Sequence, residues 1–177
     1  MPAVAGVSRA DYLPEELKPL AEIDEGVHIG DGIVVPPWSV VDLMVGLLDL
    51  KPTDIVYEVG LGSGFQAAVL AQLCREVHAV DIRPFPDSVR QLPENVYIRK
   101  GDGRLGPDQP VDAILVSCGT EQIWPRWKLM LKEGGRLVVP FGPATGQAIR
   151  KYVKVGCELV DCCDYAYATF VQLETGK

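Results

Sequence analysis

Short apolar runs alternate with stretches of helical periodicity along the chain from residue 53 onward. Alternation of buried strands with helices is typical of a parallel sheet joined by crossover helices. Gly134 and Gly135 follow the second helical stretch and are expected to end it. The pattern predicts strands at 54–60, 77–81, 96–99, 113–117 and 136–140, and helices at 64–75 and about 121–131.

Both ends of the chain extend this pattern. Residues 147–155 and 166–173 alternate between apolar and polar side chains, as edge strands of the same sheet do. Pro36-Pro37 precedes apolar positions at helical spacing, so we expect a helix over 38–50. Residues 1–37 show no period and are expected to form an irregular lead-in over the working edge of the sheet.

These elements predict an α/β fold of one domain, residues 1–177, with its core in residues 38–177. We expect a Rossmann-like, doubly wound sheet of seven mostly parallel strands with helices on both faces. The composition is typical of a globular chain, since 47% of the 177 residues are hydrophobic and 23% are charged. The chain shows no apolar run of about 18 residues and no basic, hydrophobic leader, so we expect a cytoplasmic protein without a membrane partner.

The net charge and its distribution limit the classes of binding partner that we expect. The chain has 24 acids and 17 bases, a net charge of -7, and residues 1–54 alone hold ten acids and three bases. Nucleic-acid binding requires a basic face that displaces counterions, and no such cluster occurs, so we expect no nucleic-acid partner. We interpret the acidic segment as a solvated face that aids solubility, and we expect a monomer.

Cysteine and histidine spacing argues against metal binding and against a disulfide framework. The five cysteines contain no C-x-x-C pair, and the two histidines, His28 and His78, stand far apart in the sequence. We therefore expect no metal site and assign no chemistry to the thiols.

The strongest local signal is the turn Glu58-Val-Gly60-Leu-Gly62-Ser63-Gly64, between a predicted strand and a predicted helix. Its glycines let a ligand approach the backbone and the helix start offers free N–H groups, so Gly60, Gly62, Ser63 and Gly64 are expected to contact a nucleotide-like ligand. A dinucleotide fingerprint places its third glycine one position later. Glu58 favours a cationic amino-acid ligand over a pyrophosphate, which a carboxylate repels, and this points to S-adenosylmethionine.

Four further positions are expected to complete the cofactor site. Asp81 ends the second predicted strand, where a carboxylate accepts hydrogen bonds from both ribose hydroxyls, and Ile82 follows it. Asp102, with Gly103 beside it just past the third strand, is placed to accept a hydrogen bond from an adenine amino group. An ordinary turn aspartate explains Asp102 equally well.

Longer motifs resemble the protein-L-isoaspartate O-methyltransferase family, within the class I S-adenosylmethionine-dependent methyltransferases. Residues 62–71 (GSGFQAAVLA) resemble the family's G-S-G-Y-Q-A-A segment, which is more specific than the glycine motif alone. Residues 143–147 resemble the stretch where the family places a glutamine, here Gln147, near the active site. Further similarity lies at 12–14, 29–30, 101–103, 131–142 and 170–173, so the likeness covers nearly the whole chain.

The resemblance implies methyl transfer from S-adenosyl-L-methionine to the free carboxylate of an L-isoaspartyl residue in a damaged protein or peptide, with S-adenosyl-L-homocysteine as product. It implies that the ester then cyclises to a succinimide, whose hydrolysis returns some normal aspartate. Because a carboxylate is already deprotonated at pH 7, alignment and a water-poor pocket matter more than acid–base catalysis. The lack of a Ser/His/Asp set is therefore compatible with an enzyme.

One loop departs from the family pattern. The family typically carries an Ile-Ser-Ala-Pro-His-like loop whose serine is thought to hold the substrate, and the matching stretch here is Ile33-Val34-Val35-Pro36-Pro37-Trp38. Val34 replaces the serine and Pro37 replaces the histidine. A lost charge-assisted hydrogen bond costs about 1 to 3 kcal/mol.

This loop leaves three functions open. We place Val34, Val35 and Pro36 in the active site, with Gln147 nearby, and assign no catalytic residue. The first function is an isoaspartyl methyltransferase with a modified loop. The second is a methyltransferase for a small or apolar-flanked acceptor that packs on Val34, Val35 and Trp38, and the third is a cofactor-binding module without turnover.

Overall fold

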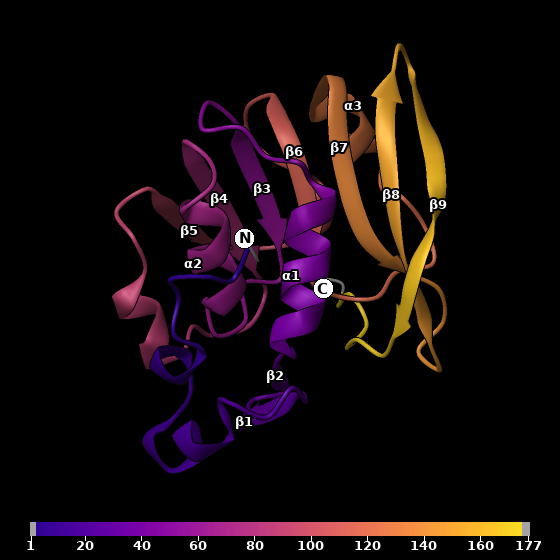
Figure 1. The fold of residues 1–177 in the computed structure, drawn as a ribbon. Helices are drawn as coiled ribbons and strands as arrows, with labels where there is room; N and C mark the ends of the chain where they lie inside the picture. Colours follow the sequence, from indigo (N-terminus) through magenta and orange to yellow (C-terminus); the bar gives the residue numbers. More distant parts are fainter. Residues whose placement is uncertain (1–2, 175–177) are drawn as a thin grey trace.

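The fold is organised around a seven-stranded sheet in the order β5-β4-β3-β6-β7-β8-β9 (Figure 1). The computed structural model describes residues 3–174, except for the side chains of residues 161 and 162. β5, β4, β3, β6 and β7 run parallel, whereas β8 and β9 join the sheet antiparallel. The strands are β3 (Ile55–Val59), β4 (Glu76–Asp81), β5 (Val96–Lys100), β6 (Val111–Val116), β7 (Leu131–Phe141), β8 (Gln147–Val155) and β9 (Glu158–Ala168).

Helices cover both faces of the sheet, as the sequence predicts. α1 (Trp38–Leu47) and α2 (Phe65–Ala71) pack on one face, and α3 (Pro125–Met130) packs on the other (Figure 1). Side chains alternate along β3, so Val56 joins the core under α1 and α2 while Tyr57 joins the core under α3. The sequence prediction of an α/β, doubly wound sheet of seven strands is confirmed.

The lead-in before α1 is more regular than the sequence predicts. It contains a two-stranded antiparallel hairpin, β1 (Val27–Gly30) and β2 (Ile33–Val35), and the 3-10 helices η1 (Arg9–Tyr12) and η2 (Glu15–Leu20). Two further 3-10 helices are η3 (Asp87–Gln91) and η4 (Gly103–Leu105). The strands β1 and β2 are too short to show an alternating pattern, so the prediction of an irregular segment was wrong there.

A buried arginine holds this lead-in together. Arg9 is 5% exposed, and its guanidinium donates to the backbone carbonyls of five residues, including Ile23 at 2.8 Å and Val35 at 3.2 Å. Because these carbonyls belong to the segment after η2 and to β2, one side chain fixes the hairpin against the preceding chain. The remaining acceptors are Leu20, Ala21 and Glu25.

The predicted boundary at Gly134 and Gly135 was wrong. α3 ends at Met130, and both glycines lie within β7 rather than at a helix end. β7 pairs with β6 at Leu131 and again from Arg136, with a register shift between the two points. The glycines therefore belong to a bulge, and Gly134 has a φ of +70° that favours glycine.

The last strand also differs from its prediction at 166–173. β9 spans Glu158–Ala168 and forms a hairpin with β8, and two register shifts interrupt their pairing. These irregularities, together with the polar residues of β9, break the alternation that marks a strand. Residues 169–174, which we call the C-terminal segment, leave the sheet and form an isolated bridge between Gln172 and Gly119.

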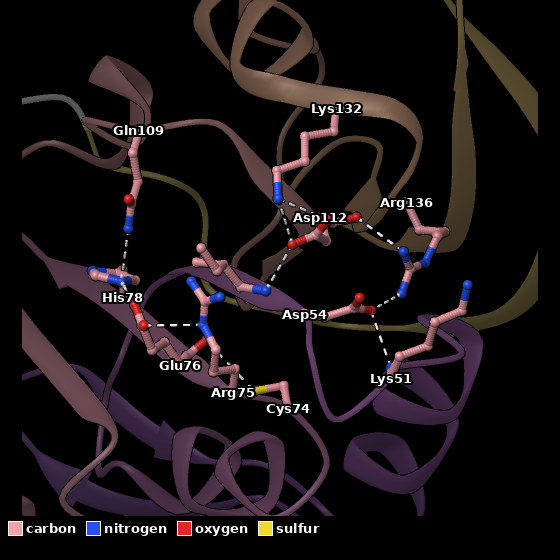
Figure 2. A network of polar contacts seen from close by, with 11 residues as sticks. Lys51, Asp54, Cys74, Arg75, Glu76, His78, Gln109, Asp112, Lys132 and Arg136 are labelled. Carbon is pink, nitrogen blue, oxygen red and sulfur yellow. Dashed lines mark hydrogen bonds and ion pairs between the residues drawn. The ribbon is translucent and has the colours of Figure 1, made fainter.

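An ion pair joins the strands at the edge of the sheet opposite their carboxyl ends. The Arg136 guanidinium on β7 contacts the Asp54 carboxylate just before β3, and both side chains are largely buried (Figure 2). The same guanidinium donates to the carbonyls of Leu48 at 2.6 Å and Asp112 at 3.1 Å. Asp112 in turn accepts from the Ile55 N–H at 2.9 Å, so this network links the end of α1 to three strands.

Replacing Arg136→Met should lower the free energy of unfolding by about 3 kcal/mol, because it leaves the buried Asp54 carboxylate without its cation. Urea denaturation followed by circular dichroism measures the loss. The matched control is Arg90→Met, whose exposed pair with Asp87 should contribute less than about 1 kcal/mol. Equal losses in both variants would contradict a structural role for the Arg136 network.

Candidate active site

A cavity of about 530 Å³ opens at the carboxyl ends of β3, β4 and β6. Ligands of α/β folds bind in the crevice at this edge, where the strand order reverses. The hairpin of β1 and β2 lies below this edge in Figure 1 and contributes one wall, and the C-terminal segment contributes another. The cavity therefore lies between the sheet and two segments that do not belong to it.

The glycine-rich turn forms the floor of this cavity. Gly60, Gly62 and Ser63 line it, and their contact with a cofactor stays a prediction. Gly62 has a φ of +54° and Gly64, which precedes α2, has a φ of +88°, a left-handed conformation that side chains rarely adopt. Gly64 is buried and lies outside the lining, so it shapes the turn from behind.

Asp81 and Ile82, which the sequence assigns to the cofactor site, line the cavity beside the turn. The Asp81 carboxylate accepts from the Gly62 N–H through Oδ2 and from the Arg83 N–H through Oδ1, each at 2.9 Å. A carboxylate offers about four acceptor positions, so two remain for a ligand. Asp81 is therefore fixed in orientation and still able to bind two hydroxyls.

Glu58 lies behind the cavity wall. Its side chain is fully buried, its Oε1 accepts from Gln66 Nε2 at 3.3 Å, and its Oε2 has no partner. Gln66, which lines the cavity, also donates to Ser117 Oγ at 2.5 Å. Burial raises the pKa of Glu58 to about 8. The hydrogen bond from Gln66 lowers this pKa, and the negative charge of Asp81 raises it further.

Asp102 and Gly103 lie differently with respect to the cavity, although they are neighbours in the sequence. Gly103 lines the cavity, and its carbonyl accepts from Trp127 Nε1 at 2.8 Å. A Cβ at Gly103 would stand 2.3 Å from Val59 Cγ1, so only glycine fits there. The Asp102 carboxylate caps η4 and pairs with Arg104, outside the lining, so its contact with an adenine stays a prediction.

The active-site loop presents a different set of side chains from the predicted one. Val34 and Pro36 line the cavity, whereas Val35 is fully buried in the core on the opposite side of β2. Trp38 is 42% exposed and lies outside the lining, so the expected apolar wall at this tryptophan is not formed. Pro37 and Val40 contribute the apolar surface instead.

Gln147 supports the cavity from behind. It is fully buried, donates from Nε2 to the Pro143 carbonyl and accepts at Oε1 from the Phe170 N–H, both at 2.8 Å. Phe170 belongs to the C-terminal segment and lines the cavity. Gln147 therefore positions this segment rather than facing a ligand.

Several polar lining residues were missed by sequence reasoning, among them His28, Ser117 and Arg83. His28 lies opposite Val34 across the β1–β2 hairpin, Ser117 follows β6, and Arg83 stands two residues beyond Asp81. Ser117 ends a predicted strand in the same way as Asp81, and this position was a usable signal. His28 carried no such signal, because the hairpin that turns it to the cavity was not predicted.

Comparison with known proteins decides the family. The family model described as protein-L-isoaspartate(D-aspartate) O-methyltransferase matches residues 1–177. The chain belongs to this family. Its members are S-adenosyl-L-methionine-dependent methyltransferases that act on isoaspartyl residues of proteins. The resemblance inferred from the sequence motifs is therefore confirmed.

Two relatives are named protein-L-isoaspartate O-methyltransferase. The one from Myxococcus xanthus is 42% identical over 152 residues, covering 81% of this chain and 72% of the relative. The one from Opitutus terrae is 40% identical over 159 residues, covering 85% of this chain and 68% of the relative.

Solved structures support the same fold. A protein-L-isoaspartate O-methyltransferase superposes with a TM-score of 0.84 at 24% identity, covering 99% of this chain and 62% of that one. A putative member of the family from Plasmodium falciparum gives a TM-score of 0.68 at 19% identity, covering 94% and 85%. An S-adenosylmethionine-dependent O-methyltransferase from Thermotoga maritima gives 0.53 at 20% identity, covering 92% and 74%, so the predicted class I methyltransferase fold is confirmed.

Two classes of feature do not occur in the part of the chain that the structure describes. Within residues 3–174 no helix has the length and apolar character to span a bilayer. Among the described side chains, which leave out residues 161 and 162, no three metal-ligating groups converge on one point.

Replacing Asp81→Ala should weaken binding of S-adenosyl-L-methionine roughly 10- to 100-fold, since about 1 to 3 kcal/mol of charged hydrogen bonding is lost. Isothermal titration calorimetry gives the dissociation constant. The matched control is Asp87→Ala, an exposed aspartate in η3 that lies outside the cavity lining. An unchanged constant in Asp81→Ala would remove this residue from the cofactor site.

Glu58 should make the folded chain less stable as pH rises. Its pKa of about 8 exceeds the value of about 4.3 for a glutamate in an unfolded chain. Between these values the folded chain retains a proton that the unfolded chain has released, so the free energy of unfolding falls from pH 5 to pH 8. Urea denaturation at pH 5.5, 6.5 and 7.5 should show a steeper decline for the wild type than for Glu58→Gln. Parallel curves would mean that Glu58 has an ordinary pKa.

Proposed function

We propose that this chain methylates the free carboxylate of L-isoaspartyl residues in damaged proteins or peptides, with S-adenosyl-L-methionine as the methyl donor. The observation that carries the proposal is one cavity with two different halves. One half, which we call the donor half, contains the glycine turn and Asp81. The other, which we call the acceptor half, contains Val34, Pro36 and the C-terminal segment. A nucleoside donor and a peptide acceptor therefore meet inside one enclosure.

The donor half fits S-adenosyl-L-methionine. Asp81 has free acceptor positions for the ribose hydroxyls, and Gly60 and Gly62 leave room along the backbone. The buried Glu58 oxygen without a partner lies beside Gln66, where a cationic amino group would relieve its isolation. When bound, this cofactor supplies an electrophilic methyl group on a sulfonium.

The acceptor half supports transfer without a general base. The carboxylate oxygen contributes the electron pair of the new O–C bond, and the pair of the broken S–C bond stays on sulfur, so no proton moves. Val34, Pro36 and Pro37 present apolar surface that excludes water from the approach. Exclusion of water favours the reaction because opposite charges neutralise each other as the groups meet.

The ester product fits the role of protein repair. An isoaspartyl methyl ester cyclises to a succinimide when the amide nitrogen of the following residue attacks the ester carbonyl and methanol leaves. The free carboxylate cyclises much more slowly, because it would have to expel hydroxide. Hydrolysis of the succinimide returns part of the residue to normal aspartate. The chain itself acts only in the methylation step.

The acceptor half differs from the family pattern at Val34, where the family has a serine. A valine can neither donate nor accept a hydrogen bond, so the acceptor has to be held by other groups of the cavity. His28 lies directly across the hairpin from Val34 and supplies a polar group at this wall. The altered loop is therefore compatible with an isoaspartyl acceptor.

We also propose a cytoplasmic location and a single subunit as the working form. Cys74, Cys118, Cys157 and Cys163 are all free thiols, as is usual in a reducing compartment. Cell fractionation tests the location, and size-exclusion chromatography with light scattering tests the subunit number.

Labelled methyl transfer to an isoaspartyl peptide tests the function. The purified chain with labelled S-adenosyl-L-methionine should yield a base-labile methyl ester on the isoaspartyl peptide and none on the same peptide with normal aspartate. Val34→Ser should raise kcat/KM about tenfold, because it restores a hydrogen bond to the acceptor. The control Val155→Ser changes an exposed valine at the end of β8, outside the cavity lining.

Absence of label on the isoaspartyl peptide, in a chain that binds the cofactor, would refute the proposed acceptor. A lower kcat/KM in Val34→Ser would instead show that the acceptor packs on apolar surface at this position.

A further inference from the structure

Arg83 is the one lysine or arginine among the described residues that line the cavity. It lies just beyond Asp81, and its side chain is 21% exposed. An isoaspartyl acceptor carries a negative charge, and Val34 stands where the family pattern has a serine. A guanidinium is the side chain best shaped to bind a carboxylate, because two parallel N–H groups match its two oxygens.

The side chain of Arg83 reaches across the mouth of the cavity. Nη1 donates to the Gly32 carbonyl in the turn between β1 and β2, and Nη2 contacts the Glu174 carboxylate of the C-terminal segment. Only the backbone N–H of Arg83 contacts the Asp81 carboxylate. The hydrogen bonds of the guanidinium therefore go to the acceptor half, whereas Asp81 in the donor half is contacted by the backbone N–H of Arg83.

Glu174 already presents a carboxylate to this guanidinium. Its side chain is 51% exposed and lies among the lining residues. Because the Glu174 side chain is half exposed, water solvates its carboxylate when it leaves the ion pair, so displacement costs little. An incoming carboxylate can therefore replace Glu174 on Arg83 without leaving an uncompensated buried charge.

We propose that Arg83 binds the carboxylate of the methyl acceptor, and that Glu174 occupies this position until the acceptor displaces it. The proposal rests on the proposed function and names the group that replaces the serine hydrogen bond. The Arg83 guanidinium contacts both carboxylate oxygens from one side, and each oxygen keeps a second lone pair that can attack the methyl group. Glu174 acts as an internal competitor for the same guanidinium.

A structural latch is the competing explanation of the same contacts. In that case the ion pair serves only to close the C-terminal segment over the cavity, and loss of either partner opens it. The two explanations predict opposite changes in KM for the acceptor when Glu174 is replaced. Removal of an internal competitor improves acceptor binding, whereas removal of a latch residue impairs it.

Steady-state kinetics on an isoaspartyl peptide separate these explanations. Arg83→Gln should raise KM for the peptide roughly 10- to 100-fold, and Arg83→Lys should give an intermediate value because a point charge replaces the fork. Glu174→Gln should lower KM about threefold or more. Arg75→Gln, which breaks an exposed pair with Glu76 at the opposite edge of the sheet, should leave KM unchanged (Figure 2).

Calorimetric binding of S-adenosyl-L-methionine confirms that each variant is folded. Its dissociation constant should change less than about threefold in Arg83→Gln, because the backbone contact with Asp81 is retained. An increase of KM in both Arg83→Gln and Glu174→Gln would overturn the proposal in favour of a latch. An unchanged KM in either variant would also overturn it. A wild-type chain that labels no isoaspartyl peptide would refute the proposed function, which the wild-type assay tests before any variant is compared.

Discussion

Parallel pairing of β3 with β4 on one side and with β6 on the other is the constraint on which the site depends. Because the three strands run in one direction, their carboxyl ends carry Gly60, Asp81 and Ser117 to the same edge. The ladder continues into the site, since the Gly60 N–H donates to the Val80 carbonyl and the Ser117 N–H donates to the Val59 carbonyl, each at 2.8 Å. The floor of the cavity therefore takes its geometry from the hydrogen bonds of the sheet.

The two walls of the cavity lie outside the strands of the sheet, and a buried side chain helps to hold each of them. The C-terminal segment also pairs with Gly119, whose N–H donates to the Val171 carbonyl and whose carbonyl accepts from the Leu173 N–H, each at 2.8 Å. Arg9 fixes the hairpin of β1 and β2 through backbone carbonyls, and Gln147 fixes the C-terminal segment through the Phe170 N–H. Both side chains bind backbone atoms of these segments, so they constrain the path of the chain more than the identity of its side chains. Residues such as Val34 can therefore vary at the walls while the enclosure keeps its shape.

The sheet and the donor half could be predicted from the sequence because their signals are local. Apolar runs mark β3, β4 and β6, and the glycine turn and Asp81 stand at fixed offsets from strand ends. The acceptor half could not be predicted, because long-range contacts build it. His28 reaches the cavity only through a short hairpin, and Glu174 approaches Arg83 across a separation of 91 residues.

With the cofactor bound as we propose, Glu58 would couple the empty and filled states of the donor half to the proton concentration of the solution. Its carboxyl group has a pKa of about 8 when no cation is near, so it is largely neutral at pH 7. A cationic ligand stabilises the ionised form, and the displaced proton then leaves for the solvent. In the proposed complex, capture of the cofactor would be accompanied by release of a proton. Acidification of the solution would therefore slow methyl transfer by releasing the cofactor from the donor half. This effect would need no change in any residue of the acceptor half.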